Sequence, residues 1–128
     1  MDDQELVEAF ESTTLPGDQF PHAAHVRVGW FYLCHHPLLE AMVRFKVALQ
    51  RFATAQGKPE RYHETITIAY LLLIAERLAG ARGLSWLEFA ERNPDLLRWQ
   101  PSVLARYYTD DTLWSERARQ VFVMPDLP

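Results

Sequence analysis

Apolar residues recur every three or four positions through most of the chain, which is the pattern of helices that bury one face. No stretch alternates apolar and polar residues as a half-buried strand does. The pattern predicts helices over residues 3–12, 21–36, 37–55 and 59–79, then several short helices and an extended tail after Gly83. We therefore expect an all-α fold, a bundle of three or four main helices with short C-terminal helices, forming a single helical domain over residues 1–128.

Proline, glycine and capping residues mark where these helices begin and end. Pro21 suits a first helical turn, because its missing N–H has no partner there, and Pro37 follows the same rule. Gly57 and Gly80 are placed to end the third and fourth helices. The SWLE segment that begins at Ser85 fits a capping box, in which two end groups satisfy each other.

The helical spacing also predicts which faces are buried. The helix over 37–55 is expected to bury a stripe made of Leu38, Met42, Phe45, Leu49 and Phe52 and to turn Arg44 and Arg51 away. Gly29 lies on the same face of the second helix as His22 and His25. Because glycine costs about 1 kcal/mol relative to alanine in a helix, its presence there favours close helix packing over room for a ligand. The tryptophans are assigned to the core.

The charge and composition of the chain limit the classes of partner that we expect it to bind. The chain has 13 basic and 17 acidic residues, a net charge of −4, and interspersed signs, whereas binding to a phosphate backbone depends on dense Lys and Arg, so no nucleic-acid partner is expected. A local anion site stays open in one region, where Arg44, Lys46, Arg51, Lys58 and Arg61 gather. The longest apolar run, Ile68 to Ala75, is far shorter than the roughly 20 residues that span a bilayer, so no membrane partner is expected. One cysteine, Cys34, and a start without a signal-peptide pattern predict a cytoplasmic protein.

Candidate chemistry lies in two segments, FPHAAHVR over 20–27 and PERYHETIT over 59–67. His22 and His25 are three positions apart in the first turns of the second helix, and His63 is placed in the first two turns of the fourth. Short connections favour antiparallel neighbours, so the second and fourth helices should run parallel and bring the three histidines to one end of the bundle. Three neutral imidazoles can bind one divalent metal ion, with zinc as the default and iron, copper or nickel as alternatives.

Further residues complete this predicted site. Glu64 is the candidate general acid or base, and Glu60 is a candidate further ligand or a group that orients a histidine. Arg61, Thr67 and Tyr70 are expected to line a pocket for a small-molecule substrate. Helix N-termini attract anions, so an anionic substrate group would suit this end.

The leading hypothesis is a small metal-dependent enzyme with a mononuclear three-histidine site, hydrolytic or lyase-type with zinc and oxidative with iron or copper. One alternative is a non-catalytic small-molecule or anion sensor. Another is a structural helical protein whose histidines form a metal-free polar cluster. A second group of ligand-type residues, Cys34, His35 and His36, lies at the C-terminal end of the second helix, where histidines complement the helix dipole. A structural role is favoured for that group.

The segments FPHAAHV, RYHETIT and YYTDDTLWSERARQVFVMPD together resemble an uncharacterised family of small bacterial helical proteins. The resemblance covers most of the chain. It implies that these segments belong to one domain and that the C-terminal tail is part of the fold, and it implies no activity.

Overall fold

The structure is a computed structural model that describes residues 1–128. It is 68% helical, with eight α-helices and no β-strand, which confirms the all-α class. The longer helices are α1 (Asp3–Glu11), α2 (His22–His35), α3 (Leu38–Ala55) and α4 (Glu64–Ala79), and the shorter ones are α5 (Trp86–Arg92), α6 (Pro94–Leu97), α7 (Asp110–Leu113) and α8 (Glu116–Gln120). Three 3-10 turns connect them: η1 (Gly17–Gln19), η2 (Pro59–Arg61) and η3 (Val103–Arg106).

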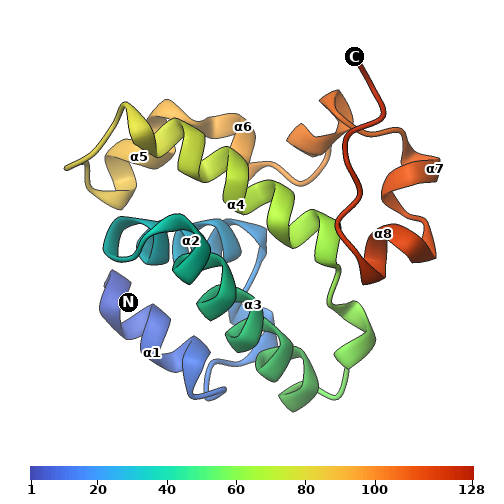
Figure 1. Cartoon of the computed structure of the whole chain (residues 1–128). Helices are drawn as coiled ribbons and strands as arrows, with labels where there is room; N and C mark the ends of the chain where they lie inside the picture. Colours follow the sequence, from blue (N-terminus) through green and yellow to red (C-terminus); the bar gives the residue numbers. More distant parts are fainter.

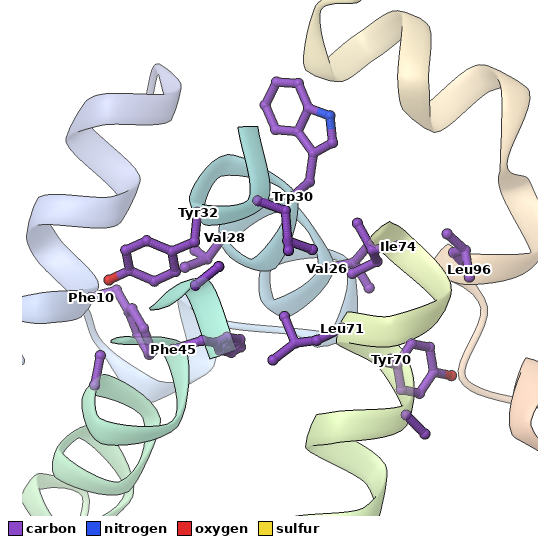
Figure 2. Close-up of a cluster of buried hydrophobic side chains, with 14 of the residues drawn as sticks. Phe10, Val26, Val28, Trp30, Tyr32, Phe45, Tyr70, Leu71, Ile74 and Leu96 are labelled. Carbon is purple, nitrogen blue, oxygen red and sulfur yellow. The ribbon is translucent and has the colours of Figure 1, made fainter. Parts of the chain in front are cut away.

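Helix α2 occupies the centre of the molecule. It packs against α1 and α3 on one side and against α4 and α6 on the other (Figures 1 and 2). Tyr32 points toward Phe10 and Phe45, whereas Val26 points toward Ile74 of α4 (Figure 2). One hydrophobic cluster of 25 buried residues connects these helices with the C-terminal segments. A helix surrounded on several sides needs apolar residues around most of its circumference, which the HAAHVRVGWFYLCH sequence of α2 supplies.

The closest approach of α2 to α4 occurs at Gly29. A Cβ atom at this position would lie 3.1 Å from Leu71 Cδ2 and 3.4 Å from Ile74 Cδ1, so the space is already filled by side chains of α4. The expectation that Gly29 serves close helix packing is therefore confirmed.

The start of α4 differs from the prediction. The chain makes the short η2 turn at 59–61, becomes extended at Tyr62 and His63, and enters the α-helix only at Glu64. His63 is the N-cap, because its ring accepts a hydrogen bond from the N–H of Ile66, one of the helix-end donors that would otherwise lack a partner. Glu60 is consequently not on the helix that begins at Glu64.

The buried face of α3 matches the expected stripe in part: Phe45 and Phe52 are buried, and Met42 and Leu49 are partly buried against the core. Its buried residues are Ala41, Phe45, Ala48 and Phe52, whereas Leu38 is 38% exposed. Small alanines alternate with phenylalanines along this face, because the neighbouring helices lie close enough to leave no room for larger residues at every turn. Two other sequence-based expectations hold: Arg44 and Arg51 are exposed, and Ser85 with Glu88 forms a capping box. On α1, the buried residues are Leu6, Val7 and Phe10.

The C-terminal segment forms two short helices, α7 and α8, and an extended tail that packs on the fold. The Thr65 hydroxyl donates to the carbonyl of Val121 and accepts from the N–H of Val123. The Asp126 carboxylate accepts hydrogen bonds from the backbone and hydroxyl of Thr109, just before α7. The tail therefore ties α7 and α8 to α4 (Figure 1). None of the helices has the length and apolarity needed to cross a bilayer.

We expect Gly29→Val to lower the free energy of unfolding by about 1–3 kcal/mol, because the added side chain overpacks the contact with Leu71 and Ile74. Urea denaturation measures this change. Gly80→Ala is the matched control, since Gly80 closes α4 at a negative φ and a Cβ there would meet nothing within 4 Å. It should alter stability by less than about 0.5 kcal/mol. Equal stability of the valine variant and the natural protein would contradict the close packing described here.

Candidate functional site

A pocket of about 1080 Å³ lies where α2, α3 and α4 meet the C-terminal segments. Its inner wall includes Phe45, Leu71 and Ile74, which are at most 4% exposed, so the pocket reaches the hydrophobic core. Its outer part is lined by Trp99 and Trp114, which are 38% and 51% exposed. All three candidate histidines line it as well.

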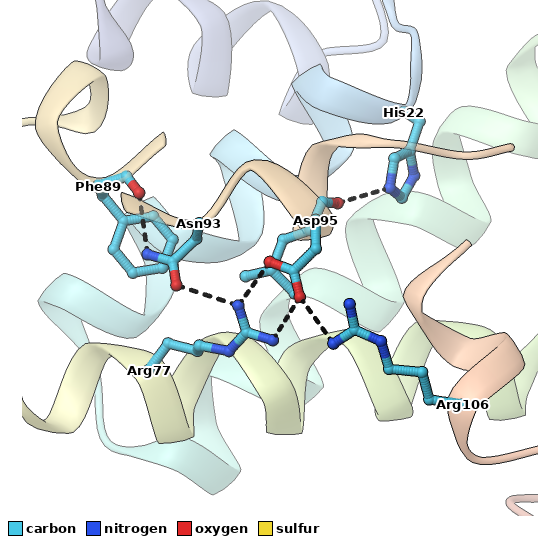
Figure 3. A network of polar contacts seen from close by, with 7 residues as sticks. His22, Arg77, Phe89, Asn93, Asp95 and Arg106 are labelled. Carbon is cyan, nitrogen blue, oxygen red and sulfur yellow. Dashed lines mark hydrogen bonds and ion pairs between the residues drawn. The ribbon is translucent and has the colours of Figure 1, made fainter. Parts of the chain in front are cut away.

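His22 begins α2 and is held by the carbonyl of Leu96 in α6. Its Nε2 atom lies 2.9 Å from that oxygen (Figure 3). A carbonyl can only accept, so Nε2 carries the proton and Nδ1 keeps a free lone pair. The ring also packs edge-on against Tyr70 and beside Trp99, with centroid distances of 4.8 and 5.0 Å. Burial lowers the pKa of His22, which favours the neutral ring, and the hydrogen bond to Leu96 opposes this more weakly.

The Leu96 carbonyl is itself held in place by a network of charges. Asp95 forms two hydrogen bonds to the Arg77 guanidinium, of 2.7 and 2.8 Å, and accepts a third from Arg106 at 3.2 Å (Figure 3). The pairing with Arg77 lowers the pKa of Asp95 to about 2. Because Arg77 belongs to α4, this network fixes the four-residue helix α6 on α4 and so fixes the acceptor of His22.

His25 is oriented by the same kind of bond. Its Nδ1 atom lies 3.0 Å from the carbonyl of Pro21, so Nδ1 donates and Nε2 keeps the lone pair. The ring lies against Phe20 with a centroid distance of 3.9 Å. Burial lowers the pKa of His25 to about 4, and the nearby His22 adds a smaller effect in the same direction. Trp30 Nε1 is the one buried polar side-chain atom without a partner, so the free nitrogens of both histidines remain accessible.

His63 differs because both of its ring nitrogens are engaged. Nδ1 accepts from the N–H of Ile66 at 3.1 Å, and Nε2 donates to the carbonyl of Leu113 at 2.8 Å. The side chain is buried, and burial lowers its pKa. In this arrangement the residue joins the start of α4 to α7 and has no lone pair left for a ligand.

The structure does not bring the three histidines together. Helices α2 and α4 do run parallel, since His22 touches Tyr70 near one end and Arg82, just after α4, donates to the Leu33 carbonyl near the other. The N-terminal ends of the two helices are offset along the helix axis, however. Tyr70 is seven residues beyond His63, which corresponds to roughly 10 Å of helix.

Two tryptophans occupy the interval between the histidines. Trp99 packs beside His22, and Trp114 packs beside His63 with a distance of 5.7 Å between ring centroids. The centroids of the two indole rings lie 6.4 Å apart. No group of three His, Cys, Asp or Glu side chains is arranged to hold a metal ion. Metal binding by His22, His25 and His63 would require His63 to give up at least the hydrogen bond that its Nδ1 atom accepts from Ile66, and it stays a prediction.

The other candidate residues fall into two groups. Arg61, Thr67 and Tyr70 line the pocket, as expected. Glu64 does not, because its carboxylate accepts from Lys46 Nζ at 3.0 Å and from the Tyr62 hydroxyl at 2.5 Å and so links α3 to the start of α4. Its expected acid/base role has no support from this position.

The histidines at the C-terminal end of α2 each have a local hydrogen-bonding or ion-pair partner. His35 bonds the carbonyl of Phe31, and His36 lies 2.6 Å from Glu40. They do not combine with Cys34 into a metal-binding group.

Basic side chains outnumber acidic ones in the pocket wall, where Lys58, Arg61 and Arg119 lie with one acidic residue, Asp18. Lys58 and Arg61 line it and have no acidic side chain within 4 Å, and Arg119 reaches Glu116 only at 4.0 Å. The clustering of basic residues over 44–61 pointed toward Lys58 and Arg61. Trp99, Trp114 and Arg119 were missed, because they come from C-terminal segments whose position only the folded chain reveals.

Comparison with protein-family models, with curated proteins and with solved structures finds no match. The chemistry of the pocket is therefore the basis for the function.

We expect the free energy of unfolding to fall as the pH is lowered from about 6.5 to about 4. The pKa values of His22, His25 and His63 are lowered in the folded protein, so across this range the unfolded chain binds protons that the folded chain does not. Their contribution is complete above the unfolded value and is lost as the pH falls toward the folded value, about 4 for His25. One pKa unit corresponds to about 1.4 kcal/mol, so His25 should account for on the order of 1–3 kcal/mol.

Urea denaturation at a series of pH values measures this loss. His25→Gln should flatten the dependence between pH 6.5 and 4, whereas His35→Gln, which changes an exposed histidine of the same helix, should leave it unchanged. An identical slope in the His25 variant and the natural protein would show that this residue is not held neutral.

The metal hypothesis makes a separate prediction. Protein purified without an affinity tag should contain nearly one metal ion per chain by elemental analysis, and His63→Asn should lose it. Asparagine is the informative replacement because it is a good N-cap and can still accept from the start of α4, which separates loss of a ligand from loss of the cap. Metal content that is unchanged in this variant would rule out His63 as a ligand.

Proposed function

We propose that the protein binds a small organic acid, with the apolar body of the ligand inside the pocket and its acid group at Lys58 and Arg61. The observation that carries this proposal is the presence of basic side chains without acidic partners in the wall of a large pocket that extends into the hydrophobic core. This is a binding function, and it corresponds to the sensor hypothesis more closely than to the metal-dependent enzyme.

The apolar part of the pocket supports binding of a hydrophobic body. Its volume of about 1080 Å³ is at the upper end of the range of ligand sites, roughly 300–1,000 Å³. Phenylalanine and aliphatic side chains from α2, α3 and α4 form most of its depth. Burying apolar ligand surface there contributes on the order of 25 cal/mol per Å².

The basic side chains support recognition of an anion. An arginine already paired with a carboxylate would have to exchange that partner for a ligand, whereas Arg61 is free to form a new charge-assisted hydrogen bond. Lys58 adds a second positive charge on the adjoining turn. Asp18 also lines the pocket, so the local charge is reduced but stays positive with Arg119 included.

The exposed tryptophans support a ligand at the same place. Trp99 and Trp114 present large apolar rings that are only partly covered by the protein. Tryptophan is typical of recognition surfaces, because it offers much contact area and a single N–H donor. Binding is favoured over metal-dependent catalysis, since His63 is committed to structural hydrogen bonds and Glu64 lies outside the pocket wall.

The proposal is tested with 8-anilinonaphthalene-1-sulfonate, an aromatic anion whose fluorescence rises in apolar surroundings. We expect a saturable rise with the natural protein and displacement of the dye by dodecanoate. Arg61→Gln should weaken dodecanoate binding roughly tenfold or more, which corresponds to the loss of one charge-assisted hydrogen bond of about 1.5 kcal/mol. Dodecan-1-ol, which has the same apolar chain without the charge, should bind the variant and the natural protein equally.

Two controls make the result specific. Arg51→Gln removes an exposed arginine of α3 that does not line this pocket, and it should leave dodecanoate binding unchanged. Near-UV circular dichroism of each variant excludes a loosened fold, which also binds this dye. An absence of saturable dye binding, or an equal loss for acid and alcohol in the Arg61 variant, would contradict the proposed function.

A further inference from the structure

The pocket contains a second recognition element, made of the two histidines at the start of α2. His22 and His25 each donate one ring N–H to a backbone carbonyl, of Leu96 and Pro21 respectively. Each therefore offers one unprotonated nitrogen, Nδ1 of His22 and Nε2 of His25, as a hydrogen-bond acceptor. We infer that the pocket selects organic acids that also carry a hydroxyl group, which donates to one of these two nitrogens. This inference rests on the proposed function.

The acceptors are held in fixed orientations. Rotation of the His22 ring would break its bond to Leu96, whose helix is fixed by Asp95 and Arg77 (Figure 3). Rotation of the His25 ring would break its bond to Pro21 and its contact with Phe20. A group held in place before binding loses little conformational entropy when the ligand arrives.

The two rings act in the same region of the pocket. They are three residues apart on α2, a spacing that brings Cβ atoms to within roughly 5–6 Å of each other. Both rings line the pocket. Burial also keeps both rings neutral at pH 7, because it lowers the pKa of each.

Three other polar groups near the histidines are already paired within the protein. The Tyr70 hydroxyl bonds Ser102, the Thr67 hydroxyl donates to the His63 carbonyl, and His63 uses both nitrogens. The histidine acceptors therefore stand out as fixed, neutral and unoccupied. A ligand without a donor would cover them and remove their contact with water, which costs free energy.

The test compares each straight-chain acid of 8 to 12 carbons with its ω-hydroxy counterpart, by displacement of the anilinonaphthalene dye. A hydroxyl group placed in an apolar pocket without a partner weakens binding. We expect instead that, for at least one chain length, the hydroxy acid binds threefold to tenfold more tightly than the plain acid, which is the effect of one net hydrogen bond. This gain should be lost when His22→Phe and His25→Phe are combined.

The variants keep an aromatic ring at each position and remove its nitrogens, together with the hydrogen bonds to Leu96 and Pro21. His35→Phe, which changes the exposed histidine at the other end of α2, is the matched control and should keep the gain. A second measurement needs no substitution. One of two ¹⁵N resonances, that of His22 Nδ1 or that of His25 Nε2, should shift when the hydroxy acid binds. Neither should shift when the plain acid binds.

The possible failures are distinguishable. If the plain acids displace the dye and every hydroxy acid binds equally or more weakly, the inference is overturned and the proposed function stands. A gain that survives in the double variant, with unchanged ¹⁵N resonances in the natural protein, also overturns it. If neither series displaces the dye, the proposed function fails and the inference fails with it.

Discussion

The contact between α2 and α4 at Gly29 sets the arrangement of the rest of the molecule. Because position 29 has no side chain, the backbone of α2 can lie directly against Leu71 and Ile74. This contact determines how far α2 lies along α4, and it places His22 beside Tyr70 instead of beside His63. The space that remains beyond the start of α2, toward the start of α4, becomes the pocket. The site therefore results from a mismatch in helix ends, which one glycine fixes.

Within that arrangement the three histidines share a physical solution. An imidazole in apolar surroundings is held neutral, and its remaining N–H needs an acceptor. Backbone carbonyls of Pro21, Leu96 and Leu113 supply it. The rings differ in the other nitrogen, which is free in His22 and His25 and occupied by a helix-end N–H in His63. Identical residue types thus keep one nitrogen free in one place and cap a helix in another.

Much of the fold could be predicted from the spacing of apolar residues, because a helical period identifies which side of a segment is buried. The close packing at Gly29 and the boundaries of α1 and α3 followed from the same local signals. The axial offset between α2 and α4 could not be predicted, since periodicity describes faces and says nothing of how far one helix slides along another. The three histidines all line one pocket, but the predicted single metal-binding cluster is divided by the offset and by two tryptophans.

The start of α4 shows a second limit. A histidine in a first helical turn and a histidine that caps the helix have the same spacing from Thr67, so the sequence pattern alone does not separate the two cases. What decides is a contact with Leu113, fifty residues away in the chain. Trp99 and Trp114 were assigned to the core for a related reason, because large hydrophobic side chains are usually buried. Only the fold shows that the side chains of these two residues remain partly exposed to solvent.

The tie between Asp126 and Thr109 has a consequence for how the pocket arises in a growing chain. Asp126 holds the start of α7, and α7 leads into Trp114 and supplies the carbonyl that bonds His63. Helices α1 to α4, which end at Ala79, leave the ribosome first, and Asp126 follows after some 47 further codons, about 2 to 9 seconds later at ordinary rates of synthesis. During that interval the apolar interior faces water without its cover. A nascent chain of this protein therefore passes through a stage in which its pocket is open on one side.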